Sequence, residues 1–306
     1  MVEEPTTLSR SRRYRAKPSR RRLLVRRLVA LGFLVGLVAL VAGSAWTLLG
    51  GREEAAPPPP PVAAPPKPLR IIFPEGFTRT DMARRISAVN EIARQKRKVR
   101  PRLSQQRYLA LTAGSSKVPR GFRTEGRPPN LEGFLFPATY EFTKRTTTRQ
   151  LVNAQLAAFR KNWASVNMRY ARSKNLTPYD VLTIASLIEK EVAVRKERPL
   201  VSAVIYNRLK AGMSLGIDAT IRYGLDVPPT EALRESQLHD PTPYNTRIHA
   251  GLPPTPIANP GLASIRAAAH PAKVDYLFFV RKPDKKHHFF TNNQRDFENY
   301  KNAHGY

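Results

Sequence analysis

The chain has 306 residues and no cysteine, and its 52 Lys and Arg against 23 Asp and Glu give a formal net charge of +29 at pH 7. Without cysteine, a disulfide scaffold, thiol chemistry and a cysteine zinc site are excluded, so the fold must rest on a hydrophobic core, which this length permits. The excess of positive charge favours polyanionic partners.

Residues 1–27 form a basic arm. They carry ten basic side chains against two acidic ones, with almost no apolar periodicity. A segment of this composition cannot bury enough apolar surface to fold. The sequence therefore predicts a disordered cytoplasmic arm at 1–27.

Residues 28–49 contain no charged side chain over 22 positions. At a rise of about 1.5 Å per residue, a helix of this length crosses a hydrocarbon core of roughly 30 Å, which predicts a transmembrane helix. The alternative is a cleaved signal peptide, whose apolar stretch is usually about 7 to 15 residues long. Because Lys and Arg are retained on the cytoplasmic side, we expect a single-pass protein of the cell membrane, with Trp46 at the outer interface and the following residues extracytoplasmic.

Residues 50–69 form a Pro-rich linker. The run AAPPPPPVAAPPKP at 55–68 predicts an extended spacer of about 3.1 Å per residue. The part after it is still strongly basic, and outside a membrane the available polyanions are wall polymers and lipid headgroups. The positive charge is also compatible with nucleic-acid binding. The sequence contains no recognisable nucleic-acid-docking motif, so we expect no nucleic-acid partner.

The folded part begins with short elements. A strand is predicted at 70–73, then a helix over 78–88 with Thr78 or Thr80 as its N-cap, and a second helix over 104–113. The aromatic segment 131–142 resembles a strand, in which a proline indicates an edge or a bulge.

Helical sequence follows in the second half. One long amphipathic helix is predicted over 148–173, and a better-marked one from Thr177, which has Pro178 and Asp180 in the N1 and N3 positions of a capped helix. Further helices are expected at 200–210 and 262–269, and a strand at 276–280 with a hairpin partner at 288–291. Together these elements predict an α+β fold.

Glu189 is the candidate general acid. It lies beside a predicted buried stripe on the helix from Pro178, formed by Val181, Ile184, Ala185, Ile188 and Val192. Small and apolar neighbours suit a general acid, because burial raises the pKa of a carboxyl and keeps it protonated near neutral pH. Glu191 points about 200° away on the helix and is not expected to share the site. The alternative is that Glu189 is an ordinary surface acid, paired with Arg195 or Lys196.

Four later segments carry a family resemblance. In this order and spacing, SLIEKEV, ERPLVSAVIYNRLKAGMSLGIDATIRYG, PYNTRIHAGLPPTPIANPG and AAAHPAKVDYLFFV resemble the endolytic murein transglycosylases, the YceG-like family. The resemblance extends from about Arg70 to Phe297 and includes FPEGFT, LEGFLFPATYEF and the membrane anchor. It implies a LysM-like subdomain at 70–115 and a YceG-like catalytic domain of mixed helix and strand at 130–306.

The resemblance also implies an activity. Members of the family cleave the bond between N-acetylmuramic acid and N-acetylglucosamine inside peptidoglycan glycan strands, without water and without metal or cofactor, leaving 1,6-anhydro ends. Their catalytic glutamate lies in the EKE segment, at the position of Glu189. Ordinary glycosidases need two carboxyl groups. One is enough here, because the carboxylate left by the first proton transfer can take the proton of the sugar's own C6 hydroxyl. The resemblance to the family also implies association with peptidoglycan synthesis complexes.

Six polar residues in the matching motifs are candidate sugar ligands. The alternative for each is loop architecture, since Asn and Thr side chains stabilise turns. The six are Asp218, Thr220, Tyr244, Asn245, Thr246 and Asn259. The adjacent His287 and His288 are too few for a zinc site and are predicted to be structural or solvated.

The chain departs from the family pattern at four positions. Gly216 stands where the family often has Gln, Ala219 where it has Pro, Ala138 where it commonly has Asp, and Thr255 where Gly is usual. If the Gln side chain of other family members contacts the sugar, this chain lacks that contact at Gly216. These departures keep open a second hypothesis, a membrane-anchored peptidoglycan-binding protein without catalytic activity.

Overall fold

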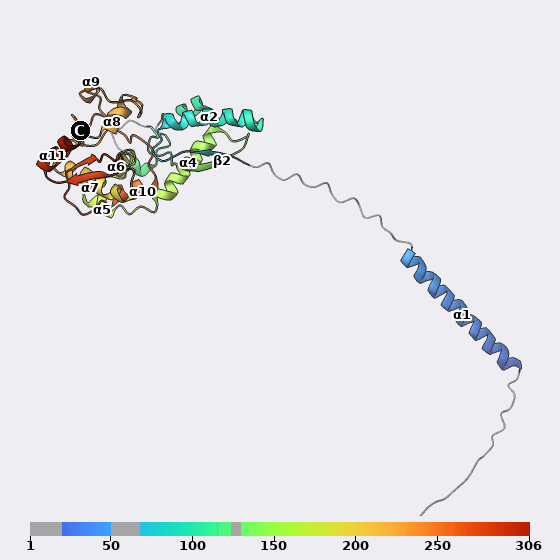
Figure 1. Ribbon diagram of the computed structural model, residues 1–306. Coiled ribbons are helices and arrows are strands. Elements are labelled where there is room, and N and C mark those ends of the chain that lie inside the picture. Colours follow the sequence, from blue (N-terminus) through green and yellow to red (C-terminus); the bar gives the residue numbers. More distant parts are fainter. Residues whose placement is uncertain (1–19, 50–67, 115, 124–129) are drawn as a thin grey trace, which may run out of the picture. The chain divides into compact units, whose positions relative to one another are not determined.

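The computed structural model describes residues 20–49, 68–114, 116–123 and 130–306 (Figure 1). Contacts divide the chain into two units, Met1–Pro65 and Pro66–Tyr306. Most of the predicted basic arm and nearly all of the predicted linker lie outside the described residues.

The first unit contains helix α1, Arg20–Leu49, which is 30 residues long. Its segment Arg27–Ser44 is long and apolar enough to cross a membrane, which confirms the helix expected at 28–49. The described apolar side chains between Val25 and Val41 are exposed. The side chain of Trp46 is outside the described part, so its predicted place at the interface is untested.

The second unit begins with a strand, two helices and a strand. Strand β1, Leu69–Ile72, pairs antiparallel with β2, Thr139–Phe142, in a register that places Leu69 opposite Phe142. Helices α2, Arg79–Arg97, and α3, Gln105–Thr112, lie between these strands in the chain and pack on one another. Because β2 belongs to the predicted 130–306 domain and β1 to 70–115, the sheet joins residues of both, and the division stays a prediction.

The expected strand at 131–142 is confirmed only over its last four residues. Before them the chain turns, with Gly133 at φ +88°. A Cβ at Gly133 would lie 2.7 Å from Cγ of Pro256, so only glycine allows this turn to pack on the later loop. Phe134, in the part before β2, is buried without strand pairing, which is why aromatic composition alone predicted a strand there.

The helix predicted over 148–173 is two helices, so that prediction was wrong. Helix α4 is Thr148–Trp163 and α5 is Arg169–Ser173. Between them the side chain of Asn167 accepts a hydrogen bond of 2.9 Å from the backbone N–H of Arg169. An Asn side chain bonded to the backbone in this way interrupts a helix and starts another.

Helix α6, Pro178–Glu191, is the centre of the second unit. Thr177 caps it, and Asp180 completes the capping box, as the sequence predicts. All five residues of the predicted apolar stripe are buried. The helix packs against α10, Leu262–Ala269, and α7, Arg198–Lys210.

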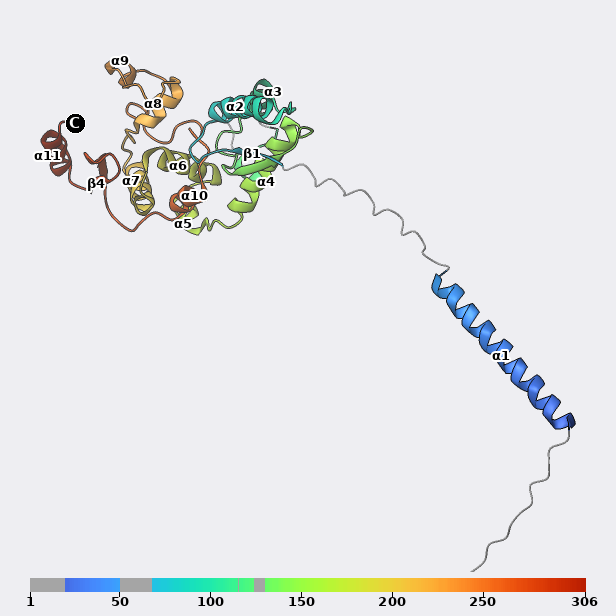
Figure 2. The ribbon, with the colours of Figure 1, turned by 45° about the vertical axis from the view of Figure 1, so that its right-hand side comes forward.

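Shorter elements complete the fold. The hairpin of β3, Phe278–Arg281, and β4, His288–Thr291, confirms the predicted pair with β3 shifted by two residues at its start. Figure 2 shows this hairpin and α11, Gln294–His304, at the opposite end of the unit from α2, α3 and α4. The sequence did not predict α11, nor α8, Asp218–Gly224, and α9, Glu235–Leu238. Two 3₁₀ turns lie at Arg120–Phe122 and Arg195–Glu197.

Candidate functional site

Glu189 is buried against a guanidinium at the end of α6. Its side chain is 6% exposed, and Oε1 lies 3.3 Å from Nη2 of Arg198. Oε2 accepts a hydrogen bond of 2.9 Å from the backbone N–H of Gly261, the N-cap of α10. The side chain is therefore not an ordinary surface acid, and its partner is Arg198 instead of Arg195 or Lys196. Both of its oxygens already have partners.

A second carboxylate, Glu75, lies in the same cluster. Nη2 of Arg198 is 3.8 Å from Oε2 of Glu75, and a Cβ at Gly261 would overlap the Glu75 carboxylate. Burial and the negative charge of Glu189 raise the pKa of Glu75 above its ordinary value. Sequence reasoning missed this residue, although it stands in the FPEGFT segment that carries part of the resemblance.

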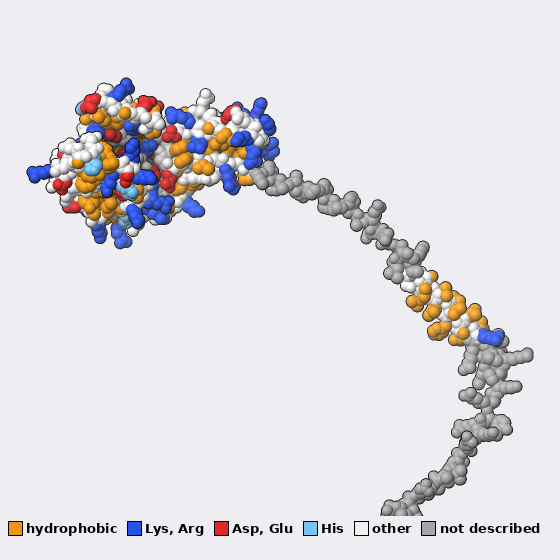
Figure 3. All heavy atoms as spheres, viewed as in Figure 1, with side chains coloured by type: hydrophobic (Ala, Val, Ile, Leu, Met, Phe, Trp, Pro, Cys, Tyr) orange, Lys and Arg blue, Asp and Glu red, His pale blue; other side chains and the backbone are white. Residues whose placement is uncertain are grey.

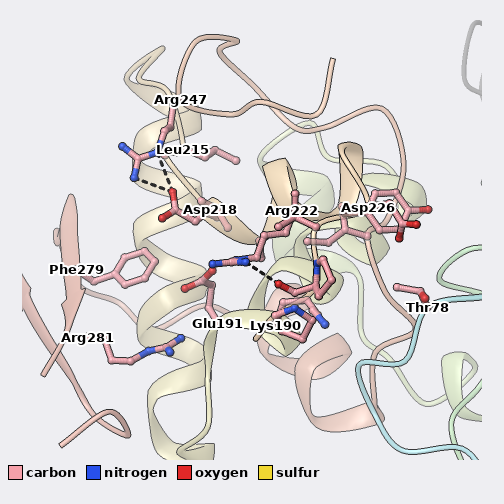
Figure 4. Close-up of a pocket in the computed structure, with 18 of the residues that line it drawn as sticks. Thr78, Lys190, Glu191, Leu215, Asp218, Arg222, Asp226, Arg247, Phe279 and Arg281 are labelled. Carbon is pink, nitrogen blue, oxygen red and sulfur yellow. Dashed lines mark hydrogen bonds and ion pairs between the residues drawn. The ribbon is translucent and has the colours of Figure 1, made fainter. Parts of the chain in front are cut away.

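Glu191 lines a large cavity that Glu189 does not reach. The cavity measures about 1410 Å³, and Lys190 and Glu191 line it together with α8 and β3 (Figure 4). Glu191 is half-buried. Burial raises its pKa to about 7, Arg281 opposes the rise, and Asp218 adds to it. A carboxyl with a pKa near 7 in a cavity is the usual arrangement of a general acid.

Charged side chains surround Glu191 in this cavity. Figure 4 shows Phe279 and Arg281 extending from β3, with Asp218 and Arg222 on α8. Arg222 is held in place by the carbonyl oxygens of Pro228 and Glu231, to which its Nη1 donates at 2.9 and 2.7 Å. Mixed polar and aromatic walls of this kind suit a hydroxylated ligand. The lining includes Thr78, Arg79, Lys190, Glu191, Gly216, Asp218, Arg222, Tyr223, Arg247, Phe279, Arg281 and His288.

Glu132 is a buried carboxylate at the wall of the same cavity. It accepts hydrogen bonds from the backbone N–H of Arg79 at 3.1 Å, from Nδ2 of Asn259 at 2.7 Å and from the hydroxyl of Tyr223 at 3.1 Å. Burial raises its pKa to about 7, although the Arg79 backbone bond acts against the rise. In the sequence, nothing indicates this role beyond the position of Glu132 in LEGFLF.

Two of the six predicted sugar ligands have partly accessible side chains. Asp218 lines the cavity and forms an ion pair of 2.7 Å with Nη2 of Arg247. Tyr244 is half-buried, with its hydroxyl 2.9 Å from Oγ1 of Thr255 and its ring edge-on to Tyr223. A ligand that entered the cavity would meet Asp218 directly.

The other four are buried and bonded inside the protein. The hydroxyls of Thr220 and Thr246 lie 3.0 Å apart. Nδ2 of Asn245 donates to the carbonyl of Asp240 at 2.8 Å, and Oδ1 of Asn259 accepts from the backbone N–H of Leu135 at 2.9 Å. These bonds are those of loop architecture, which the sequence left open as the alternative. Their role as sugar ligands stays a prediction.

Three of the four departures from the family pattern have described contacts, which do not by themselves explain the residue type. Gly216 lines the cavity at φ +61°, and a Cβ there would lie 3.4 Å from Nη1 of Arg208. Thr255 is fully buried and donates to the carbonyl of Pro256 at 2.8 Å. Ala138 contributes its carbonyl to the backbone N–H of Phe73 at 3.0 Å.

Both histidines of the hairpin are paired with carboxylates. Nδ1 of His288 lies 2.7 Å from Oε2 of Glu197 and is buried, while Nδ1 of the exposed His287 lies 2.8 Å from Oδ2 of Asp284. Within the described residues, no group of three or more His, Asp or Glu side chains is arranged to hold a metal ion.

Comparisons with known proteins agree on one family. Residues 61–303 match the model of the YceG-like family. Over 181 residues the chain is 37% identical to an endolytic murein transglycosylase of Streptococcus pneumoniae (strain ATCC BAA-255 / R6), covering 58% of this chain and 32% of that one. Over 152 residues it is 37% identical to one from Bacillus subtilis (strain 168), covering 50% of this chain and 42% of that one.

A solved structure supports the fold. The crystal structure of a YceG-like protein from Listeria monocytogenes superposes with a TM-score of 0.59 and 28% sequence identity, over 76% of each chain. The match to the two transglycosylases covers less than half of their own length.

Proposed function

Because the chain belongs to the YceG-like family, we propose that it is an endolytic lytic transglycosylase of peptidoglycan. It would cleave the bond between N-acetylmuramic acid and N-acetylglucosamine within glycan strands and leave 1,6-anhydro ends. Relatives named endolytic murein transglycosylase support this reading. The observation that carries it is Glu191, a carboxyl whose pKa of about 7 suits acid/base work, in a cavity of about 1410 Å³.

We propose Glu191 as the acid/base, in place of the sequence-based choice, Glu189. A general acid must reach the atom that it protonates. Glu191 lines the cavity, whereas Glu189 is 6% exposed and both of its oxygens already have partners. Glu189 remains the alternative, in which case Arg198 would have to release it when substrate binds.

The proposed reaction needs one carboxyl and no water. Protonated Glu191 gives its proton to the glycosidic oxygen while the bond from that oxygen to C1 breaks. The carboxylate so formed takes the proton of the C6 hydroxyl, and O6 bonds to C1, which restores the acid. Arg281 lowers the pKa of Glu191 and so stabilises the carboxylate form, while Asp218 raises it and favours the protonated form.

Paired substitutions test the assignment. In the purified full-length chain, Glu191→Gln should lower the rate of glycan cleavage about 10²- to 10⁴-fold with thermal stability kept, the usual share of general acid/base catalysis. Glu189→Gln is the matched control on the same helix and should cost much less. Mass spectrometry of the digested glycan measures both.

The outcomes separate the hypotheses. Loss of cleavage only in Glu189→Gln would return the acid to that residue. If the parent chain binds glycan and does not cleave it, the non-catalytic binding protein is correct. Products made in heavy-oxygen water should carry no label at the new end, and labelled reducing ends would indicate hydrolysis by a second carboxyl.

The remaining expectations belong to the same proposal. The order β1, α2, α3, β2 supports a LysM-like subdomain, which the strand at Thr139–Phe142 would complete beyond the predicted 70–115. The apolar helix α1 supports a membrane anchor, with the arm before it in the cytoplasm. Association with peptidoglycan synthesis complexes would follow from this position beside the membrane.

A further inference from the structure

Basic side chains are concentrated at one end of the Pro66–Tyr306 unit. The last turns of α2 and the loop after it carry six exposed basic residues within nine positions, which we call the basic end: Arg94, Lys96, Arg97, Lys98, Arg100 and Arg102. Glu91 pairs with Arg94 at 2.9 Å. In the described part of the chain, no carboxylate forms an ion pair with the other five.

The β2–α4 turn adds positive charge at the same place. The backbone N–H of Ser104, just after the basic loop, donates to Oγ1 of Thr148 at 3.0 Å. The turn before Thr148 exposes Lys144 and Arg145. This hydrogen bond holds the residue after the basic loop against the start of α4, a few residues after Lys144 and Arg145.

The same surface lies where the unit joins its tether. Thr148 follows β2, whose last residue, Phe142, is paired with Leu69, the first residue of β1. The chain reaches α1 from Leu69 through residues 50–68, which span at most about 70 Å when fully extended. Figure 3 shows Lys and Arg side chains gathered at the end of the unit that carries α2.

We propose that the basic end docks on anionic lipid headgroups of the membrane that α1 anchors. Each Lys or Arg near an anionic bilayer adds favourable electrostatic energy, and a short tether keeps the surface at a high effective concentration near the bilayer. Ile92, which is 53% exposed on α2 two residues before the basic end, supplies an apolar side chain for the headgroup region. The inference does not depend on the proposed enzymatic activity.

Charge and tether together favour lipid over a free polyanion. A soluble polymer could bind a basic surface anywhere on the unit, whereas the basic end lies at the end of the unit from which the chain leads to α1. The attraction should fall with salt, since the Debye length is about 8 Å at physiological ionic strength.

The absence of cysteine from the sequence allows a direct test. The full-length chain carrying Gln95→Cys, labelled with a fluorophore, is reconstituted into vesicles of phosphatidylglycerol and phosphatidylcholine that contain a headgroup quencher. The probe should be quenched in these vesicles, and much less in phosphatidylcholine alone or at high salt. A label at Asn302→Cys on α11 should not be quenched in either.

Charge variants identify the surface responsible. Replacing Lys96, Arg97, Arg100 and Arg102 with Gln should shift the docking equilibrium about tenfold or more toward the free form. Changing the three arginines to Lys should preserve docking, which separates a charge effect from misfolding. The matched control replaces four exposed basic residues with Gln. They lie at the far end of α4, on α5 and directly after α5: Lys161, Arg169, Arg172 and Lys174.

Three results would overturn the proposal. They are equal quenching in vesicles with and without phosphatidylglycerol, equal loss of docking in the α4–α5 control, and no quenching by lipid in a parent chain that binds soluble polyglutamate. The last result would assign the basic end to an anionic wall polymer.

Discussion

Glu132 joins three parts of the second unit through one buried carboxylate. Its partners are the first residue of α2, the hydroxyl of Tyr223 on α8, and Asn259 in the loop before α10. A buried donor that loses its acceptor costs about 1–3 kcal/mol. The wall of the cavity therefore depends on this side chain, whichever carboxyl performs the chemistry.

We predict that Glu132→Ala lowers the free energy of unfolding of the second unit by about 3 kcal/mol or more, because several buried donors lose their acceptor. Glu132→Gln is the matched control, since it keeps an acceptor and the Tyr223 hydroxyl can turn to accept from its amide. Denaturant unfolding of both variants measures the difference. Equal stability of Glu132→Ala and the parent would show that the network contributes nothing.

Glu132 should also make stability depend on pH. Its pKa is about 7 in the folded state against 4.5 for the free side chain, so between these values the folded protein binds more protons than the unfolded one. Its contribution is therefore complete below pH 4.5 and is lost as the pH rises through about 7. The stability of Glu132→Gln relative to the parent should rise over this range. A difference that stays flat with pH would contradict the shift.

For single residues, sequence reasoning succeeded where the helical spacing alone determines which side chains are buried. The buried stripe of α6 follows from helical spacing, and the burial of Glu189 follows from its place beside that stripe. Glu75 and Glu132 could not be found in this way, because their partners, Arg198 and Asn259, lie more than a hundred residues away in the chain. The sequence did not indicate the cavity around Glu191, because the segments that line it lie far apart in the chain.

Helix caps fix where several elements begin. The sequence left Thr78 and Thr80 as alternative caps of α2, and the structure selects Thr78. Oγ1 of Thr78 accepts from the backbone N–H of Asp81 at 3.1 Å and donates to the Asp81 carboxylate at 2.8 Å. Thr80 lies inside the first turn.

We predict that Thr78→Ala lowers the free energy of unfolding by about 1 kcal/mol, the usual cost of a lost cap. Thr80→Ala, the same change two residues later, should change it by only a few tenths. Thermal or denaturant unfolding of the two variants makes the comparison. The reverse order would mean that α2 begins two residues later.

Several elements with local signals were predicted, although α11, which has Asn293 as its N-cap and Gly305 as its C-cap, was not. The capping box at Thr177 and the hairpin strand at 288–291 have clear local signatures, and both are confirmed. Helix α8 begins in a Gly- and Pro-containing region without a side-chain cap, and it is held by packing against α6. The break after Trp163 interrupts an amphipathic pattern that runs on through it, and Asn167 bonds to the backbone at the start of α5.

The whole chain combines a membrane-spanning candidate with a folded unit of mixed helix and strand. We predict that protease added to intact cells after wall removal degrades residues 70–306 while an epitope at residue 5 stays protected. The physical reason is the retention of a basic segment on the cytoplasmic side. A degraded epitope together with a protected folded part would reverse the orientation.

Helix α2 runs from the cavity to the basic end. Its first turn lines the cavity, and its last turn carries the basic end. With 19 residues at about 1.5 Å each, it is about 28 Å long. With the basic end on lipid, as proposed, the first turn of α2 would lie at most about 28 Å farther from the bilayer than its last turn, so the proposed cleavage would take place on glycan close to the membrane.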